Sequence, residues 1–250
     1  MMQLMAANWK MFKTRSEARA TAQALADTLG AAPQGREVLV IPPFTAVAEV
    51  AAAFQGKPGF LCGGQDFYPA DKGAFTGEIS PGQLLDAGAA CALTGHSERR
   101  HVLGESDEFV GEKTSYGLNS GLSIILCIGE KIEERKAGQL QAVLERQMAA
   151  GLKDVPGDVD PARLSVAYEP VWAIGTGEVA KPSDIVEAHG LVRSWLKERF
   201  GDKALEIRIL YGGSVKPDNA SEIMGLDNVD GVLVGGASLE AESFSRIVTA

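Results

Sequence analysis

The sequence predicts an α/β fold, a single (β/α)8 barrel that takes in residues 1–250 as one domain. Short, continuous apolar runs alternate with helical stretches along the whole chain. Continuous apolar runs are typical of parallel strands that are buried on both faces. About eight strand–helix units fit into this length, as a (β/α)8 barrel requires, and no change in composition or Pro/Ser-rich linker divides the chain.

The pattern predicts where each element lies along the chain. Strands are expected at residues 3–8, 37–41, 59–64, 90–94, 123–128, 164–168, 206–210 and 231–234. Helices are expected at residues 16–29, 45–54, 81–87, 107–119, 131–151, 183–200, 219–224 and 240–248. An open, doubly wound sheet would also fit this alternation. However, no Gly-x-Gly-x-x-Gly follows the first strand, so a dinucleotide-binding fold has little support.

Charge and cysteine content narrow the class of protein. The formal net charge of −9 disfavours nucleic acid and anionic membranes as partners. The three cysteines, Cys62, Cys91 and Cys127, form no Cys-x-x-Cys pair, which favours a reducing compartment. Neither a signal peptide nor an apolar run of the ~18 residues needed to cross a membrane is visible. We therefore expect a cytoplasmic protein.

Chemically active residues gather after the predicted strands, where the catalytic rim of such a barrel lies. The segments are Asn8-Trp9-Lys10, Gly95-His96-Ser97-Glu98-Arg99-Arg100, the run from Glu169 to Gly177, Tyr211-Gly212-Gly213-Ser214-Val215 and Gly235-Gly236-Ala237-Ser238-Leu239. These segments closely resemble those of the triosephosphate isomerase family, and the resemblance spans the whole chain. It implies the interconversion of dihydroxyacetone phosphate and D-glyceraldehyde 3-phosphate through an enediolate, in glycolysis and gluconeogenesis. The sequence shows no cluster of metal ligands and no nucleotide-binding motif, so we expect no cofactor and no metal.

The resemblance assigns Glu169 as the base and His96 as the electrophile, the pairing already known for this family. A lone Glu that ends a strand is usually a surface residue, but Pro170 favours an extended backbone that places Glu169 at the strand tip. His96 precedes what looks like the first turn of a short helix, whose positive end disfavours an imidazolium. The other histidines, His101 and His189, lie within helical segments, and we expect structural roles for them.

Lys10 is expected to supply local positive charge near the substrate, which the overall negative charge of the protein does not. A Schiff-base role for Lys10 is the rival interpretation. Asn8 is similar to a polar residue that orients the substrate or Lys10. Glu98 resembles a buried family residue that pairs with Lys10, although a salt bridge to Arg99 or Arg100 is an equally plain interpretation.

The phosphate grip implied by the resemblance consists of Gly175, Ser214, Gly235 and Gly236, since glycine lets backbone amides approach an anion closely. Residues 170–180 resemble the lid that closes over the substrate and excludes water. In this chain Glu178 and Lys181 replace residues that are common in relatives. We expect these changes to alter the movement of the lid and leave the chemistry intact.

The loop from Phe67 to Glu78 resembles the loop through which members of the family form homodimers. Phe12 and Asp66 differ from the residues usual in relatives, and both lie in regions used for that contact. Cys127 is expected to be a buried packing residue. Two other functions are considered: a Schiff-base aldolase and a barrel that binds phosphate without catalysis. A separate adhesive role of the surface is neither supported nor excluded by the sequence.

Overall fold

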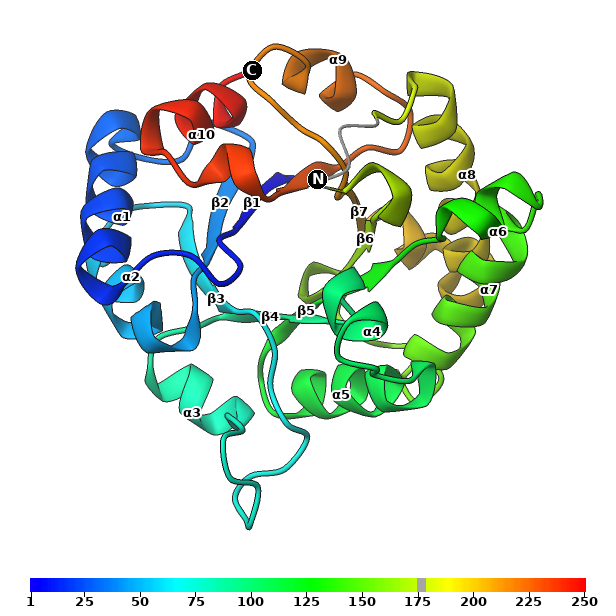
Figure 1. The fold of residues 1–250 in the computed structure, drawn as a ribbon, viewed down its shortest axis with the longest axis horizontal. Helices are drawn as coiled ribbons and strands as arrows, with labels where there is room; N and C mark the ends of the chain where they lie inside the picture. Colours follow the sequence, from blue (N-terminus) through cyan, green and yellow to red (C-terminus); the bar gives the residue numbers. More distant parts are fainter. Residues whose placement is uncertain (175–178) are drawn as a thin grey trace.

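The computed structural model describes residues 1–174 and 179–250, and its strands form a closed parallel barrel in sequence order, β1 to β8 (Figure 1). The strands are β1 (Gln3–Asn8), β2 (Arg36–Ile41), β3 (Phe60–Gly64), β4 (Cys91–Thr94), β5 (Ser123–Ile128), β6 (Leu164–Tyr168), β7 (Arg208–Tyr211) and β8 (Gly231–Val234). The predicted (β/α)8 fold is confirmed.

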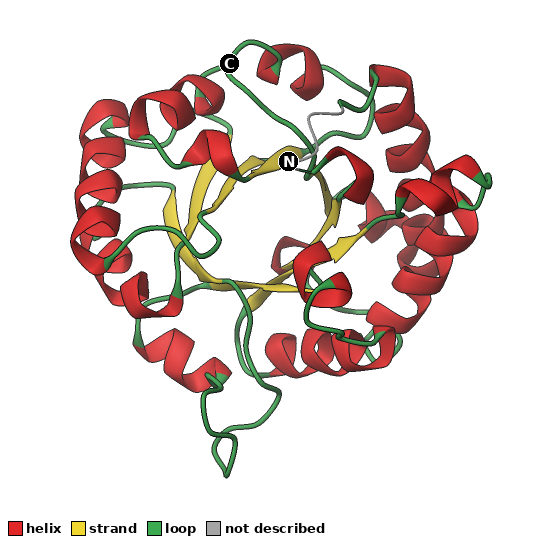
Figure 2. Ribbon diagram, in the orientation of Figure 1, coloured by secondary structure: helices red, strands yellow, loops and turns green. Residues whose placement is uncertain are grey.

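Helices form an outer ring around the strands (Figure 2). The α-helices are α1 (Arg15–Leu29), α2 (Val47–Ala53), α3 (Pro81–Asp86), α4 (Ser97–His101), α5 (Asp107–Asn119), α6 (Ile132–Lys136), α7 (Leu140–Gly151), α8 (Pro182–Phe200), α9 (Ala220–Met224) and α10 (Ala241–Val248). Short 3-10 turns are η1 (Phe44–Ala46), η2 (Pro161–Arg163), η3 (Val171–Ala173), η4 (Gly201–Leu205) and η5 (Gly236–Ser238). The turn η3 follows β6, Glu169 and Pro170.

The barrel closes where β8 pairs with β1, with Leu4 opposite Gly231 and Ala6 opposite Leu233. A Cβ atom on Gly231 would overlap the carbonyl oxygen of Leu4. The glycine therefore permits the close approach of the two backbones that closure requires. Because every strand is parallel to its neighbours, the C-terminal ends of all the strands meet at one rim of the barrel.

Each strand contributes side chains to two separate apolar layers. In β1, Leu4 and Ala6 belong to the cluster that fills the barrel, whereas Met5 and Ala7 pack in the layer beneath the helices. Successive strand residues point to opposite faces, so burial of both faces needs an uninterrupted apolar run. This packing explains why the predicted strands show no polar–apolar alternation.

Two predicted elements were wrong in detail. The helix expected at residues 131–151 is divided into α6 and α7, because Gly138 between them has φ of 70°, a conformation that an α-helix does not accommodate. The seventh strand starts at Arg208 rather than Glu206. The amide of Glu206 donates instead to the carbonyl of Lys203 at 2.9 Å, which extends the turn of η4.

The N-cap residue of α8 is Lys181, which has no side-chain hydroxyl to cap the helix. The carboxylate of Asp184 accepts a hydrogen bond from the backbone amide of Lys181 at 2.9 Å. Asp184 also pairs with Arg135 of α6 at 2.7 Å. An acidic side chain at this position therefore satisfies one free amide and links α8 to its neighbouring helix.

His189 of α8 is fully buried beneath the rim. Its Nδ1 lies 2.8 Å from the carbonyl oxygen of Asn228, and its ring packs edge-on against Tyr168. Burial lowers the pKa of His189 from 6.5 to about 4, because the charged imidazolium loses its hydration. His189 is therefore neutral in the folded protein, in agreement with a structural role.

The contribution of His189 to stability should consequently fall as the pH is lowered from 6.5 toward 4. In that range the unfolded chain binds a proton at His189 that the folded chain does not, which costs roughly 3 kcal/mol by pH 4. Urea unfolding at pH 7 and pH 4.5, at one fixed protein concentration, would measure the loss. A His189→Gln control should lose less stability than the wild type, and equal losses in the two proteins would contradict this assignment.

Candidate active site

A cavity of about 360 Å³ opens at the C-terminal ends of the strands. It is lined by Asn8, Lys10, Phe12, His96, Glu169, Ala173, Ile174, Gly212, Gly213, Ser214, Val215, Lys216, Leu233, Gly235, Gly236 and Ala237. The structure thus brings together seven of the eight site residues named from the sequence. The eighth, Gly175, lies outside the described residues, as does Glu178.

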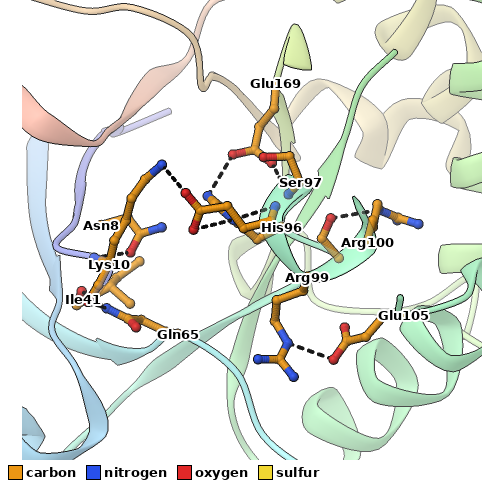
Figure 3. Close-up of polar contacts among 12 residues, drawn as sticks. Asn8, Lys10, Ile41, Gln65, His96, Ser97, Arg99, Arg100, Glu105 and Glu169 are labelled. Carbon is orange, nitrogen blue, oxygen red and sulfur yellow. Dashed lines mark hydrogen bonds and ion pairs between the residues drawn. The ribbon is translucent and has the colours of Figure 1, made fainter. Parts of the chain in front are cut away.

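Glu169 follows β6 and is only 2% exposed. Its backbone amide donates to the carbonyl of Ile128 at 2.7 Å, which holds it beside the end of β5. One carboxylate oxygen, Oε2, accepts a hydrogen bond from the amide of Ser97 at 2.9 Å, and Oε1 lies 3.1 Å from Nε2 of His96 (Figure 3). The carboxylate is therefore held at the cavity wall, largely removed from water.

His96 is the N-terminal capping residue of α4, and its Nδ1 accepts a hydrogen bond from the amide of Glu98 at 3.3 Å. A ring nitrogen that accepts a hydrogen bond carries no proton, so the proton of the neutral imidazole is on Nε2. This nitrogen faces Glu169 and the cavity. Helix α4 therefore selects the tautomer of His96 that can donate a hydrogen bond to a bound molecule.

Lys10 reaches across the rim from β1 toward α4 (Figure 3). Its Nζ donates to Oε1 of Glu98 at 2.6 Å, so Lys10 is the partner of Glu98. The expectation that Glu98 is buried was wrong, because its side chain is 48% exposed. Glu98 sits on the first turn of a short helix at the open rim and has solvent on one side.

The backbone of Lys10 has φ of 49°, a strained value for a residue with a side chain. Two hydrogen bonds hold it there: the Lys10 amide donates to Oδ1 of Asn8 at 2.9 Å, and Nε2 of Gln65 donates to the Lys10 carbonyl at 2.7 Å. Asn8 thus orients Lys10. The contribution of Gln65 was missed, because it comes from a different strand end and no sequence pattern links the two.

Two glycines let the backbone at the rim pass close to Glu169 and Lys10. A Cβ on Gly235 would lie 3.4 Å from Cε of Lys10, and a Cβ on Gly212 would lie 2.8 Å from Cγ of Glu169. The turns after β7 and β8 therefore present backbone to the cavity. The carbonyl of Ser214 accepts a hydrogen bond from Asn219 at 3.1 Å, which stabilises the first of these turns.

The sequence analysis did not assign several lining residues to the site: Phe12, Ala173, Ile174, Gly212, Gly213, Val215, Lys216, Leu233 and Ala237. Lys216 could have been found, since it lies two residues after Ser214 in the same turn. Leu233 could not, because strand periodicity does not say which core residue lies nearest the rim. Phe12 is an aromatic residue that is 55% exposed at the edge of the cavity.

Glu130 holds the start of the segment that was expected to form a lid, in its described residues 170–174. Its Oε1 accepts hydrogen bonds from Nε1 of Trp172 at 2.8 Å and from the hydroxyl of Tyr168 at 3.1 Å. Burial raises the pKa of Glu130. The hydrogen bond between Trp172 and Glu130 links η3 to the loop that follows β5.

Asp66 lies inside the protein and does not face outward. It is 3% exposed and pairs with Lys113 and Arg99, each at 2.8 Å, beneath the protruding loop. Burial raises the pKa of Asp66 to about 6, against the effect of these two cations. Asp66 differs from the residue usual in relatives. Because it is buried, this difference affects how the loop is anchored and does not alter a surface that a partner would touch.

Cys127 is buried in the cluster that fills the barrel, as expected of a packing residue. Burial, together with the nearby carboxylate of Glu169, raises the pKa of its thiol well above the usual range. The thiol is therefore kept protonated and unreactive. Within residues 1–174 and 179–250, no group of three His, Cys, Asp or Glu side chains could hold a metal ion.

The closed barrel, a buried carboxylate beside a neutral imidazole and a glycine-rich rim with a lysine define a class of protein: a barrel enzyme for acid–base chemistry on a small anionic molecule. The family model "Triosephosphate isomerase" matches residues 3–250. The chain belongs to the triosephosphate isomerase family.

The similarity to individual relatives extends over the full length. The chain is 63% identical to the triosephosphate isomerase of Nitratidesulfovibrio vulgaris (strain DSM 19637 / Miyazaki F), over 100% of both sequences. It is 49% identical to that of Lawsonia intracellularis, over 99% of this chain and 97% of the relative. The crystal structure of the triosephosphate isomerase from Bartonella henselae is similar, with a TM-score of 0.88 and 37% identity over 99% and 98% of the two chains.

Gly129, directly after β5, provides a test of how closely Glu169 is packed. A Cβ at Gly129 would overlap the backbone carbonyl of Glu169, and backbone cannot move aside as a flexible side chain can. We expect Gly129→Ala to displace Glu169 and to lower kcat on triose phosphate by about 10²-fold or more, since ångström-scale misplacement of a catalytic group costs about that much.

Gly190→Ala is the matched control, because its Cβ would meet nothing within 4 Å and it lies inside α8. This variant should keep full activity and gain slightly in thermal stability, since alanine favours a helix over glycine. Steady-state kinetics and thermal unfolding of both variants would decide. A fully active Gly129→Ala would show that the end of β5 does not position Glu169.

Proposed function

We propose that Glu169, His96 and Lys10 perform the reaction of this family, the interconversion of dihydroxyacetone phosphate and D-glyceraldehyde 3-phosphate. The isomerase activity, which belongs to glycolysis and gluconeogenesis, follows from family membership. The observation that supports this proposal is the 3.1 Å contact between the Glu169 carboxylate and Nε2 of His96 at the wall of the cavity that Lys10 also lines.

The reaction moves a proton between two adjacent carbons through an enediolate. Glu169 removes the proton from one carbon and returns it to the other. The residue is 2% exposed and its carboxylate is fixed at the cavity wall by the amide of Ser97, so the base is held in position beside the bound substrate. A base held in position typically contributes about 10²–10⁴ in rate.

Nε2 of His96 donates a hydrogen bond to the substrate oxygen on which negative charge develops. A preorganised donor of this kind contributes about 10²–10³ in rate. A neutral imidazole is suited to this role, because it can also pass a proton between the two oxygens of the enediolate. The hydrogen bond from the Glu98 amide to Nδ1 keeps the donor proton on the side of the cavity.

Lys10 supplies the positive charge of the site. Its Nζ is held by Oε1 of Glu98 at 2.6 Å, and this contact fits an electrostatic role better than a Schiff base, which needs a free amine. Asn8 orients Lys10, and the backbone of Gly175, Ser214, Gly235 and Gly236 holds the phosphate. Because the protein carries a net charge of −9, attraction of a phosphorylated substrate depends on such local cations.

The whole chain, residues 1–250, is proposed to act as one cytoplasmic domain. No helix among the described residues is long and apolar enough to cross a membrane. Two subunits are proposed to associate through the loop from Phe67 to Glu78, which extends away from the ring of helices between β3 and α3 (Figure 1). Its Phe75 is 40% exposed although it stacks on Tyr68, with ring centroids 4.2 Å apart.

Glu169→Gln and His96→Gln test the catalytic roles. Glu169→Gln keeps the shape of the side chain but loses the base, and His96→Gln replaces the imidazole with an uncharged amide, so kcat should fall by about 10³-fold and about 10²-fold respectively. The assay couples isomerisation of D-glyceraldehyde 3-phosphate to reduction of the dihydroxyacetone phosphate formed. Retention of wild-type kcat in either variant would reject the role of that residue, and an inactive wild type that binds phosphate would favour a non-catalytic barrel.

Sedimentation velocity at micromolar concentration tests the homodimer. The wild type should sediment as a dimer, and Phe75→Glu should weaken association by at least about tenfold, because a charge would be placed on an apolar contact. Leu205→Glu is the control, since Leu205 is also exposed but lies just before β7, at the opposite end of the barrel. A fully active wild-type monomer would contradict the proposed assembly.

A further inference from the structure

Arg100, four residues after His96, is a buried arginine that joins two strand ends. Its Nε donates to the carbonyl of Gly95 at 2.7 Å, and its Nη2 donates to the carbonyl of Cys127 at 3.2 Å (Figure 3 shows the first contact). Gly95 follows β4 and Cys127 belongs to β5. One planar guanidinium therefore spans the gap between the strand that leads to His96 and its neighbour.

The turn at Gly95 is shaped around this guanidinium. Gly95 has φ of 68°, and a Cβ there would lie 2.6 Å from Nη2 of Arg100 and 2.8 Å from Cγ1 of Val110. The left-handed conformation sends the chain sharply from β4 into α4, with His96 at the corner. The carbonyl of Gly95 has to point at Arg100 for this corner to hold its shape.

The end of β5, which Arg100 contacts through Cys127, is also bonded to Glu169. The amide of Glu169 is bonded to Ile128, the residue after Cys127, and the carboxylate of Glu169 lies close enough to Arg100 for their charges to interact. Burial lowers the pKa of Arg100, and the carboxylates of Asp107 and Glu169 oppose this effect. Arg100 thus borders the structures that carry both proposed catalytic groups without lining the cavity itself.

We propose that Arg100 is a positioning residue, whose guanidinium locks the Gly95 turn against the end of β5 and thereby sets the distance between His96 and Glu169. This inference rests on the proposed roles of those two residues. Arginine suits the task because its rigid fork offers donors in several directions at once. A lysine would keep the charge, but a single ammonium on a flexible chain does not hold two carbonyls in a fixed geometry.

A purely structural role is the competing explanation, since Arg100 also forms an ion pair with Asp107 at the start of α5. Asp107 has a second partner, Arg146 of α7, which is largely exposed. The two arginines therefore share one carboxylate, but only Arg100 contacts Gly95 and Cys127. Arg146→Lys is accordingly a matched control for Arg100→Lys, with the same chemical change at the same ion-pair cluster.

Steady-state kinetics of both variants provide the first test. We expect Arg100→Lys to lower kcat by about 30- to 100-fold with KM changed less than threefold, since the phosphate grip is untouched while the catalytic pair is misplaced. Arg146→Lys should keep kcat within twofold of the wild type. Should Arg100→Lys fail to fold, Arg100→Gln retains one amide donor toward Gly95 and should show the same loss confined to kcat.

Nitrogen-15 NMR of the imidazoles gives a readout that a loss of stability alone would not move. The chain has three histidines, so the His96 signals can be assigned by comparison with His96→Gln. The His96 nitrogens should shift in Arg100→Lys and stay in place in Arg146→Lys. The proposal would be overturned if Arg100→Lys kept the kcat of the wild type or if Arg146→Lys lost as much kcat. It would also be overturned if Arg100→Lys lost kcat while its His96 signals stayed in place.

The outcomes separate this inference from the proposed catalytic roles. If Glu169→Gln and His96→Gln remain active, the roles themselves are wrong, and the kinetics of Arg100→Lys are not needed to show it. If those two variants lose activity while Arg100→Lys keeps wild-type kcat, only the positioning role of Arg100 is wrong.

Discussion

Closure of the barrel is the constraint on which the rest of the structure depends. Parallel pairing of every strand, completed by β8 against β1, brings all the C-terminal strand ends to one rim. Lys10, His96 and Glu169 are far apart in the sequence, yet each directly follows a strand or its first turn. The same closure buries both faces of the strands, so that the apolar interior supports a polar rim of few residues.

At that rim, charged groups are held by backbone as much as by one another. The carboxylate of Glu169 accepts from the amide of Ser97, the imidazole of His96 accepts from the amide of Glu98, and Lys10 is held in a strained conformation by Asn8 and Gln65. These backbone groups belong to the barrel and its adjoining helix, so they define the positions of the side chains that they contact. The short helix α4 supplies two of these amides.

Sequence patterns predicted the number and order of the strands, because a strand buried on both faces must be apolar throughout. They failed where local geometry decides: Gly138 divides one predicted helix in two, and a 3-10 turn delays the start of β7. At the site, seven of the eight named residues line the cavity, and Gly175 lies outside the described residues. Gln65 and Leu233 were missed because their importance comes from neighbours that are distant in the sequence.

The sequence by itself determined the fold class, the family resemblance and the residues that line the rim, since these depend on local apolar runs and on motifs that follow each strand. Only the tertiary structure decided how those residues are paired: Lys10 with Glu98, Asp66 with Lys113, and Arg100 with the carbonyls of Gly95 and Cys127. Such pairings depend on which strand ends become neighbours and on which side chains lose contact with water. Both are consequences of barrel closure, which cannot be predicted from any short stretch of the sequence.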